Sequence, residues 1–419
     1  MPAPLAAVVE QCAYDYGNSY DAYLVVESGR EYFLASGEPG CVGFTRHGSY
    51  AHVVGGLLTA PAHRHELLRE FLAFAHRERL HVSFYNVAER DVAFYRRQGF
   101  QLTKWGEDPV IDLRTTTWQG KAFEWLRRQE NFCRRQGVEI CEIVPDADDP
   151  DFRDHTSHEL NDVSQSHLRA TKHGRELGML VSRFNPLDLK RRRLWVARRE
   201  GRVEAFIVGN PCAGGREWAI ETYRRRAEAT RGVMPALMMA AMRQMQREGI
   251  EGVSLCLIPC LRCETPTEGD SALVRRGLSF WWRHGNWLFD MRGIYHYKSR
   301  FRPEFRPMYV AASPRITFGS MRSCLRKWEV CRPNPAALMR SMGQWLQKLA
   351  PRRSLAAPTT PTPTRPRPEP QTVSQRGLRI DPASTVRTSA APAPQREMIA
   401  PREASPVRAA IESSWSVEA

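Results

Sequence analysis

The chain has 419 residues, of which 42% are hydrophobic and 26% charged, and its formal net charge is +15 at pH 7. A chain of this length and composition can bury the cores of two domains, which excludes a fully disordered or fibrous protein. No run approaches the ~20 apolar residues that cross a bilayer, and no secretory signal begins the chain, so we expect no integral membrane segment. The positive charge favours RNA or an anionic lipid surface as partner, although an arginine-rich surface alone would produce the same excess.

Residues 1–115 are predicted to form the first of two folded units. Short strands separated by turn residues occupy positions 23–56. A helix follows over His63–Arg79, because its apolar residues recur at helical spacing. A further strand, a helix over Glu89–Gln98 and a strand pair that ends at Leu113 complete this unit.

Residues 116–315 are predicted to form the second unit. Its expected elements are, in chain order, the helix Lys121–Gln136, the strand 138–144, the helix 159–170, a hairpin turning at Glu200-Gly201, the strand 216–223, the helix Met234–Arg247 and the strand 252–258. Both units follow the order of an N-acetyltransferase (GNAT) unit, with a meander, a helix, a strand, a helix and a strand. The sequence therefore predicts an α+β fold with tandem GNAT-like units.

Residues 316–350 are predicted to be a helical extension, with helices over Ser320–Val330 and Pro335–Leu349. The second helix carries an apolar stripe flanked by basic residues, so it is expected either to lie in a membrane interface or to pack against its own domain. Residues 351–419 contain twelve prolines, ten arginines and six acidic residues, and are expected to be a disordered tail.

Several motifs in a shared order make a function arguable. The stretch 94–131 contains a Tyr-x-x-x-Gly-Phe segment, a Lys-x-Gly-Glu-x-x-x-x-Asp-Leu segment and a helix that opens with Gly-Lys. Other motifs follow at Ser182-Arg183-Phe184, at Glu221 to Arg224 and at Tyr297 to Pro303. Over about 300 residues this order resembles the C-terminal catalytic domain of the phosphatidylglycerol lysyltransferases, also called aminoacyl-phosphatidylglycerol synthases.

The resemblance implies transfer of an aminoacyl group from aminoacyl-tRNA to a hydroxyl of an anionic membrane lipid. It implies no cofactor and no metal, and a cytoplasmic protein that binds peripherally at the inner face of the membrane. Many relatives carry a multi-helix membrane portion before this domain, which we expect this chain to lack. Two other functions stay open: aminoacyl-tRNA-dependent transfer to a peptide or other amine, and an inactive RNA- or membrane-binding module.

Coenzyme A is not expected as the donor. Acetyltransferases of this fold bind its pyrophosphate with a glycine-rich loop at a helix N-terminus, where backbone N–H groups face the anion. The corresponding stretch in the second unit, TYRRRAEATRGVMPALM, offers Gly232 alone.

The residues assigned to catalysis are Glu221, Arg224 and Glu176. Glu221 and Arg224 match the family's Asp-x-x-Arg segment, with Glu in place of Asp. By resemblance, Glu221 would hold the substrate ammonium or assist proton transfer, and Arg224 would hold a phosphate or the ester. Taken without the family, the first two would form a surface ion pair of small energetic value, and Glu176 would be a solvated loop residue.

The residues assigned to substrate binding are Lys298, Arg300, Tyr297, Phe301 and Arg183. Basic and aromatic side chains alternate on what is predicted to be an extended segment at 295–302. Such alternation suits a phosphate backbone with a stacked base or a lipid headgroup, and it also occurs in ordinary half-buried strands. A histidine upstream, His167, is either a general base or simply a polar side chain on a helix.

The ten cysteines are read as reduced thiols. Cys256, Cys260 and Cys263 have the C-x3-C-x2-C spacing that holds an iron–sulfur cluster in radical enzymes. No repeating strand-helix barrel pattern surrounds them, so buried or loop thiols are the favoured interpretation.

Overall fold

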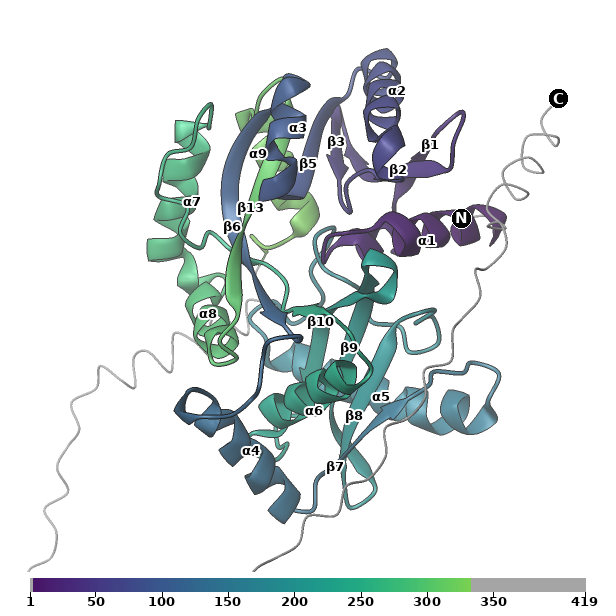
Figure 1. Cartoon of the computed structure of the whole chain (residues 1–419), viewed down its shortest axis with the longest axis vertical. Coiled ribbons are helices and arrows are strands. Elements are labelled where there is room, and N and C mark those ends of the chain that lie inside the picture. Colours follow the sequence, from purple (N-terminus) through teal and green to yellow (C-terminus); the bar gives the residue numbers. More distant parts are fainter. Residues whose placement is uncertain (1–2, 333–419) are drawn as a thin grey trace, which may run out of the picture. The chain divides into compact units, whose positions relative to one another are not determined.

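The computed structural model describes residues 3–332, which form one mixed β-sheet with helices packed against it (Figure 1). The strand order is β1-β2-β3-β5-β13-β6-β11-β10-β9-β8-β7, with β4 paired to β2 and β12 paired to β6. The predicted helix over 335–349 and the predicted tail over 351–419 lie outside the described residues. Within the described part of the chain, no helix is long and apolar enough to cross a membrane.

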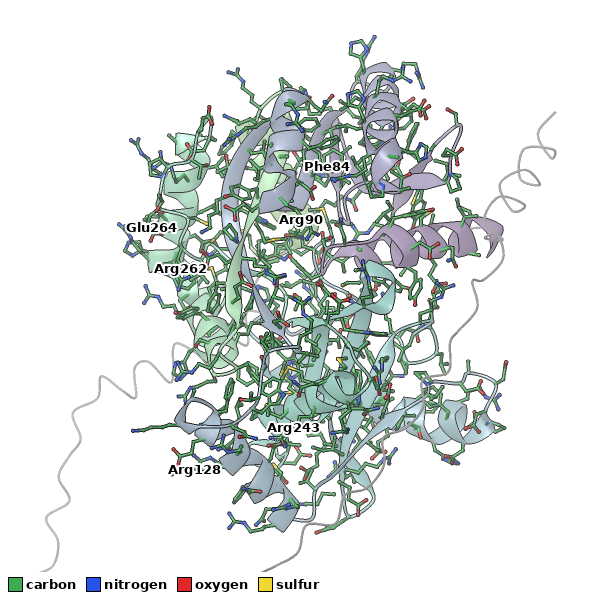
Figure 2. The ribbon with its side chains drawn as sticks, in the orientation of Figure 1. Phe84, Arg90, Arg128, Arg243, Arg262 and Glu264 are labelled. Atoms are coloured by element: carbon green, nitrogen blue, oxygen red, sulfur yellow. The ribbon has the colours of Figure 1, made fainter. Side chains whose placement is uncertain are left out.

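Most of the first half of the sheet follows the predicted order of elements, but the helix Ala3–Tyr16 is not among the predicted ones, and the predicted strand pair that ends at Leu113 is one continuous strand, Gln101–Asp112. Its strands are β1 (Glu31–Leu34), β2 (Gly40–His47), β3 (Tyr50–Val53), β4 (Leu58–Thr59), β5 (His81–Ala88) and β6 (Gln101–Asp112), and its helices are α1 (Ala3–Tyr16), α2 (Arg64–Arg77) and α3 (Val92–Arg97). Helix α2 confirms the predicted helix over 63–79, because its apolar residues, among them Leu68 and Phe71, face the core. Phe84 of β5 is fully buried in that core (Figure 2).

The second half also follows the predicted order. Its elements are α4 (Glu124–Arg135), β7 (Glu139–Ile143), α5 (Ser157–Ala170), β8 (Arg193–Arg199), β9 (Arg202–Cys212), β10 (Glu217–Arg225), α6 (Val233–Arg247) and β11 (Gly252–Ser254). The predicted hairpin is confirmed: Glu200 and Gly201 join β8 to β9 with φ of 52° and 78°. Positive φ at both central residues matches the right-handed twist of the strands.

The last described elements cross back to the first half. They are β12 (Ile258–Pro259), α7 (Ala272–His284), α8 (Met291–Ser299), β13 (Glu304–Ser313) and α9 (Phe318–Trp328). β13 lies between β5 and β6, although its sequence belongs to the predicted second unit, 116–315. β6 pairs with both β13 and β11, so it joins the two halves in one sheet. The boundary near residue 115 itself stays a prediction.

Two predicted extended segments are wrong. Residues Ala22–Val26 form the 3₁₀ turn η1, with most of its side chains buried, and Met291–Ser299 form helix α8. A short apolar run does not distinguish a strand from a buried turn, since both bury their side chains. The remaining short turns are η2 (Pro61–His63), η3 (Glu89–Asp91), η4 (Lys121–Phe123), the π turn η5 (Phe152–Thr156), η6 (Ala213–Gly215) and η7 (Gly285–Trp287).

Candidate active site

One cavity of about 260 Å³ collects charged side chains from elements that are distant in sequence. Its wall includes four of the predicted site residues: Glu176, Glu221, Arg224 and Lys298. The turn after α1, the first half of the sheet and α9 contribute large aromatic and polar groups to the same wall, among them Tyr20, Asn86, Trp105 and Trp328. The cavity therefore joins a mostly apolar enclosure to a small set of convergent charges, the usual composition of a ligand site.

Glu221 reaches the cavity from an irregular position in β10. Ile220 pairs with Gly209 of β9 and Thr222 pairs with the next residue, Val208, so Glu221 is an extra residue in the ladder. A β-bulge of this kind redirects a side chain and is common beside active sites.

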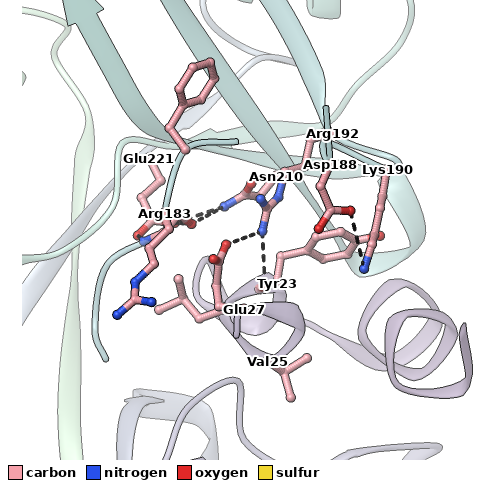
Figure 3. Close-up of polar contacts among 12 residues, drawn as sticks. Tyr23, Val25, Glu27, Arg183, Asp188, Lys190, Arg192, Asn210 and Glu221 are labelled. Carbon is pink, nitrogen blue, oxygen red and sulfur yellow. Dashed lines mark hydrogen bonds and ion pairs between the residues drawn. The ribbon is translucent and has the colours of Figure 1, made fainter. Parts of the chain in front are cut away.

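The Glu221 carboxylate is held by three donors. It accepts hydrogen bonds from the backbone N–H of Ser182 at 2.8 Å and from the Ser182 hydroxyl. It accepts a third from Asn210 Nδ2 at 3.0 Å (Figure 3). Burial raises the pKa of Glu221, while the hydrogen bonds from Ser182 oppose that rise. The net effect is a pKa for Glu221 above the ordinary value of a glutamate.

Arg224 pairs with Glu176 rather than with Glu221. Its Nη2 donates to Glu176 Oε1 at 3.2 Å, and the two side chains are only 12% and 21% exposed. The same glutamate oxygen accepts the backbone N–H of Phe184 at 3.0 Å, which fixes the carboxylate. The alternative of a surface pair between Glu221 and Arg224 is therefore wrong, as is that of a solvated loop residue for Glu176.

Arg224 also has one N–H group that makes no hydrogen bond within the described residues. Its buried Nε finds no hydrogen-bond partner among residues 3–332. Burial lowers the pKa of the Arg224 guanidinium, which nevertheless stays charged at neutral pH. An unsatisfied cationic N–H in a cavity wall is suited to an anionic or carbonyl oxygen of a ligand.

Lys298 is a buried ammonium at the end of α8. Its Nζ donates to the backbone oxygens of Cys256 at 2.8 Å and Leu257 at 3.5 Å, and the residue is 4% exposed. Burial lowers the pKa of Lys298, partly balanced by Cys256, Asp108 and Glu221. Both hydrogen bonds go to neutral carbonyls, so neither of them supplies a counter-ion.

His167 lies in the wall of the same cavity as a neutral ring. Burial, and then the charges of Arg224 and Arg225, lower its pKa to about 4. Its Nδ1 accepts the backbone N–H of Arg225 at 3.5 Å, which leaves the proton on Nε2. In this tautomer Nε2 is a donor towards a ligand, so the arrangement does not favour the general-base interpretation.

The remaining predicted substrate residues lie outside this cavity wall. Phe301 has no exposed surface and packs in the core of the second half, so its assignment to substrate binding is wrong. Tyr297 donates to Met238 Sδ at 3.0 Å. The Arg300 guanidinium stacks 4.8 Å from the ring centre of Trp125. Arg183 is exposed and donates to Ser28 Oγ at 3.3 Å.

Sequence reasoning named Ser182 within a motif but missed Asn210, which also holds Glu221 in place. Asn210 lies near the end of the apolar strand β9 and is 2% exposed. A buried polar side chain needs a hydrogen-bond partner, so an asparagine directly after an apolar run indicates a polar contact at that point. A second missed contact anchors the segment after Ser182: Arg192 Nη2 donates to Glu27 Oε1 at 2.6 Å and to the Tyr23 carbonyl oxygen at 3.5 Å (Figure 3). This buried pair attaches the segment to η1 of the first half.

The three spaced cysteines are separate buried thiols. Burial raises the pKa of Cys256 and Cys260, and it raises that of Cys263 to about 12, so all three are protonated at neutral pH. Among residues 3–332, no three or more His, Cys, Asp or Glu side chains are grouped to hold a metal ion. Cys256 also lies in the cavity wall.

The family described as "Phosphatidylglycerol lysyltransferase, C-terminal" matches residues 13–312. The chain belongs to this family. Among curated relatives, the phosphatidylglycerol lysyltransferase of Bacillus subtilis (strain 168) is 27% identical over 246 residues, which are 58% of this chain and 28% of the relative. That of Staphylococcus epidermidis is 22% identical over 296 residues, 70% of this chain and 34% of the relative. The chain thus spans about a third of the length of these lysyltransferases.

Two solved structures of this family share the fold. "The structure of L-PGS from Bacillus licheniformis" is matched with a TM-score of 0.65 at 23% identity, over 79% of this chain and 97% of the other. The C-terminal domain of a putative lysylphosphatidylglycerol synthetase from Agrobacterium fabrum is matched with a TM-score of 0.63 at 21% identity, over 76% and 94%. The predicted α+β fold class is confirmed.

Proposed function

We propose that this chain transfers an aminoacyl group from aminoacyl-tRNA to a hydroxyl of phosphatidylglycerol or a similar anionic lipid. The observation that carries the proposal is the convergence of Glu176, Glu221, Arg224 and Lys298 on one cavity in a chain of the lysyltransferase family. The relatives named above are lysyltransferases, which supports the same reaction class here.

The reaction exchanges one ester for another. The acceptor hydroxyl oxygen bonds to the aminoacyl carbonyl carbon, the bond from that carbon to the terminal ribose oxygen of tRNA breaks, and the hydroxyl proton ends on the ribose oxygen. Little driving force is needed, so the protein must hold the two substrates together, move one proton and stabilise the oxyanion of the tetrahedral intermediate.

Each charged group fits one of these tasks. Glu221, whose pKa is raised, holds the amino acid's ammonium or moves the hydroxyl proton. Arg224 offers its free Nε–H to the lipid phosphate or the ester oxygen, and Glu176 orients that guanidinium. Lys298 adds a second positive charge for the phosphate or the oxyanion.

The donor assignment is supported by charge. The net charge of +15 favours a polyanion such as tRNA. Gly232 is the N-cap of α6, and a Cβ placed on it would lie 2.4 Å from Gln129 Oε1 of α4. Acetyl-coenzyme A is disfavoured as the donor by the sequence of this stretch, which has the single glycine Gly232. The proposal therefore needs no cofactor, and it places the protein at the cytoplasmic membrane surface.

The test is transfer of a labelled amino acid from a mixture of charged tRNAs to vesicles that contain phosphatidylglycerol, followed by lipid extraction. Label should enter the lipid phase, and the rate should fall steeply as salt is raised. Label in a peptide or amine instead would replace the lipid acceptor. Label that stays on tRNA while the tRNA binds would identify an inactive binding module, and micromolar binding of acetyl-coenzyme A would reject the tRNA donor.

A further inference from the structure

A second cavity, of about 230 Å³, lies between α7 and α9 against the sheet. Its wall is formed mainly by apolar side chains of both helices together with residues of β5, β6 and β13, among them Tyr85, Trp105, Leu278, Trp281, Leu325 and Trp328. Almost all of the surface in this cavity is apolar, unlike that of the charged site. None of the residues assigned above to catalysis contributes to this wall.

The two cavities share a wall. Trp105 and Trp328 line both, and their ring centres are 6.1 Å apart. A molecule that occupies both cavities would therefore have an apolar part against α7 and α9 and a polar part near Arg224. An anionic lipid has both parts, because its headgroup is polar and its acyl chains are apolar.

The shared wall also carries two unused donors. The indole Nε1–H groups of Trp105 and Trp328 are buried and find no hydrogen-bond partner among residues 3–332. Both residues are only 6% exposed. A buried N–H without a partner is costly, and an indole can only donate, so an acceptor oxygen from a ligand would stabilise either group. The ester carbonyls of a lipid lie between its headgroup and its acyl chains, just as Trp105 and Trp328 lie between the charged cavity and the apolar one.

The surface around this cavity is apolar and basic. Four of the six large apolar side chains that are strongly exposed in residues 3–332 are on α7, η7 or the start of α9: Leu273, Phe280, Trp287 and Phe318. Helix α7 has three arginines and α9 has two arginines and a lysine, while neither helix has an acidic residue. Exposed aromatic residues with basic neighbours are typical of a helix in the interface of an anionic membrane.

We infer that α7 contacts the anionic membrane and that the cavity between α7 and α9 binds an acyl chain of the acceptor lipid. The indole N–H groups of Trp105 and Trp328 bind the ester carbonyls, and the headgroup enters the site at Arg224. This inference rests on the proposed function for the identity of the lipid as an acceptor. The binding of the chain is separable from catalysis.

The first experiment measures binding without tRNA. The full chain is titrated with soluble dihexanoyl phosphatidylglycerol and with glycerophosphoglycerol, which has the same headgroup and no acyl chains. The acylated ligand should bind at least ~10-fold more tightly, since each buried methylene adds affinity. Equal affinities would overturn the inference.

Gly277 allows a matched pair of variants. It lines the cavity, and a Cβ added to it meets no atom within 4 Å. Gly277→Leu should fill the mouth of the cavity and abolish the preference for the acylated ligand, whereas Gly277→Ala should retain it. Both should melt at or above the wild-type temperature, because each removes a helix-interior glycine. If Gly277→Leu melts normally and keeps the preference, the chain binds elsewhere.

The indole contacts have their own test. Trp328→Phe keeps a large ring and removes the N–H, so it should weaken dihexanoyl phosphatidylglycerol several-fold and leave glycerophosphoglycerol unchanged. An equal loss for both ligands would overturn the contact to the ester carbonyl.

Membrane contact is tested by flotation with vesicles of phosphatidylglycerol and phosphatidylcholine. The double variant Phe280→Ser, Trp287→Ser should bind at least ~10-fold more weakly than wild type. The matched control Val144→Ser, which removes an exposed apolar side chain away from α7, should bind normally. Equal binding of the three proteins would exclude α7 as the contact. If acylated ligand and vesicles bind as expected but no aminoacyl group is transferred, the proposed function fails and this binding site stands.

Discussion

Replacing Glu221 by Gln removes the negative charge of this side chain and retains most of its hydrogen bonds to Ser182 and Asn210. Glutamine has the same length and keeps one oxygen for the Ser182 N–H, while its amide group replaces the oxygen that faces the Ser182 hydroxyl and Asn210. The hydroxyl can rotate to accept, so one hydrogen bond at most, that from Asn210, is lost.

The expected effect on stability is small because two contributions oppose each other. A hydrogen bond to a carboxylate contributes about 1.5–3 kcal/mol. The raised pKa of Glu221 shows that burial disfavours its charge, so the neutral amide avoids that cost. The net change should lie within ~2 kcal/mol, a shift in Tm of no more than about 4 °C for a chain of this size. Turnover should fall by ~10²-fold or more if the charge binds the ammonium or moves the proton.

The assay is single-turnover transfer from charged tRNA to lipid, with thermal melting measured in parallel. Glu251→Gln, which alters an exposed ion pair with Arg114, is the matched control and should stay within about two-fold of wild type. Glu221→Ala should lower both activity and stability, because it leaves Ser182 and Asn210 with unpaired donors. Turnover of Glu221→Gln within about three-fold of wild type would show that the charge is not used. Loss of its melting transition would show that Glu221 is structural.

Three further outcomes are expected. Arg224→Lys keeps a charge but loses the Nε–H and the Nη2 that donates to Glu176. It should therefore weaken lipid binding by ~10-fold or more, measured as KM for the acceptor. An unchanged KM would contradict the role of Nε. Burial raises the pKa of Asp108 from 3.8 to about 6, so its neutral form stabilises the fold below pH 4 and this contribution is lost as the pH rises through 6. Asp108→Asn should therefore raise the free energy of unfolding by ~3 kcal/mol at pH 8 and leave it unchanged at pH 4, as measured by denaturant titration. The same gain at both pH values would show that the charge of Asp108 is not its source. Glu27→Gln leaves the buried Arg192 without its counter-ion and should cost ~3 kcal/mol in the same titrations, whereas a cost below ~1 kcal/mol would mean that the pair is solvated.

The sequence predicts the elements whose pattern is local. Helix α2 and the hairpin at Glu200-Gly201 were found because hydrophobic spacing and turn chemistry act over a few neighbouring residues. Helix α8 is not predicted, because the alternation of basic and aromatic residues at 295–302 indicates an extended segment. The helical spacing of Met291, Ile294 and Lys298 is also present in the sequence. A period of two and a period of 3.6 overlap over so short a stretch.

The partners of the site residues could not be predicted. The sequence motif identified Glu221 and Arg224, yet their contacts come from Ser182, 39 residues away from Glu221, and from Glu176, 48 residues away from Arg224. Such pairings depend on how the segment before β8 lies across the sheet, and no local pattern encodes that placement. The same holds for Trp328, which joins the cavity from the far end of the described chain.

The spacing of the acidic residue and Arg224 also has a structural reason. In a regular strand, side chains alternate between faces, so residues three apart point to opposite sides of the sheet. Glu221 and Arg224 nevertheless line one cavity. The bulge at Glu221 explains this, because one extra residue in β10 shifts the alternation of side chains between the two faces by one position. The Asp-x-x-Arg motif, here Glu-x-x-Arg, thus fits a bulged strand, and the irregular ladder lets an acid and an arginine of one strand line the same cavity.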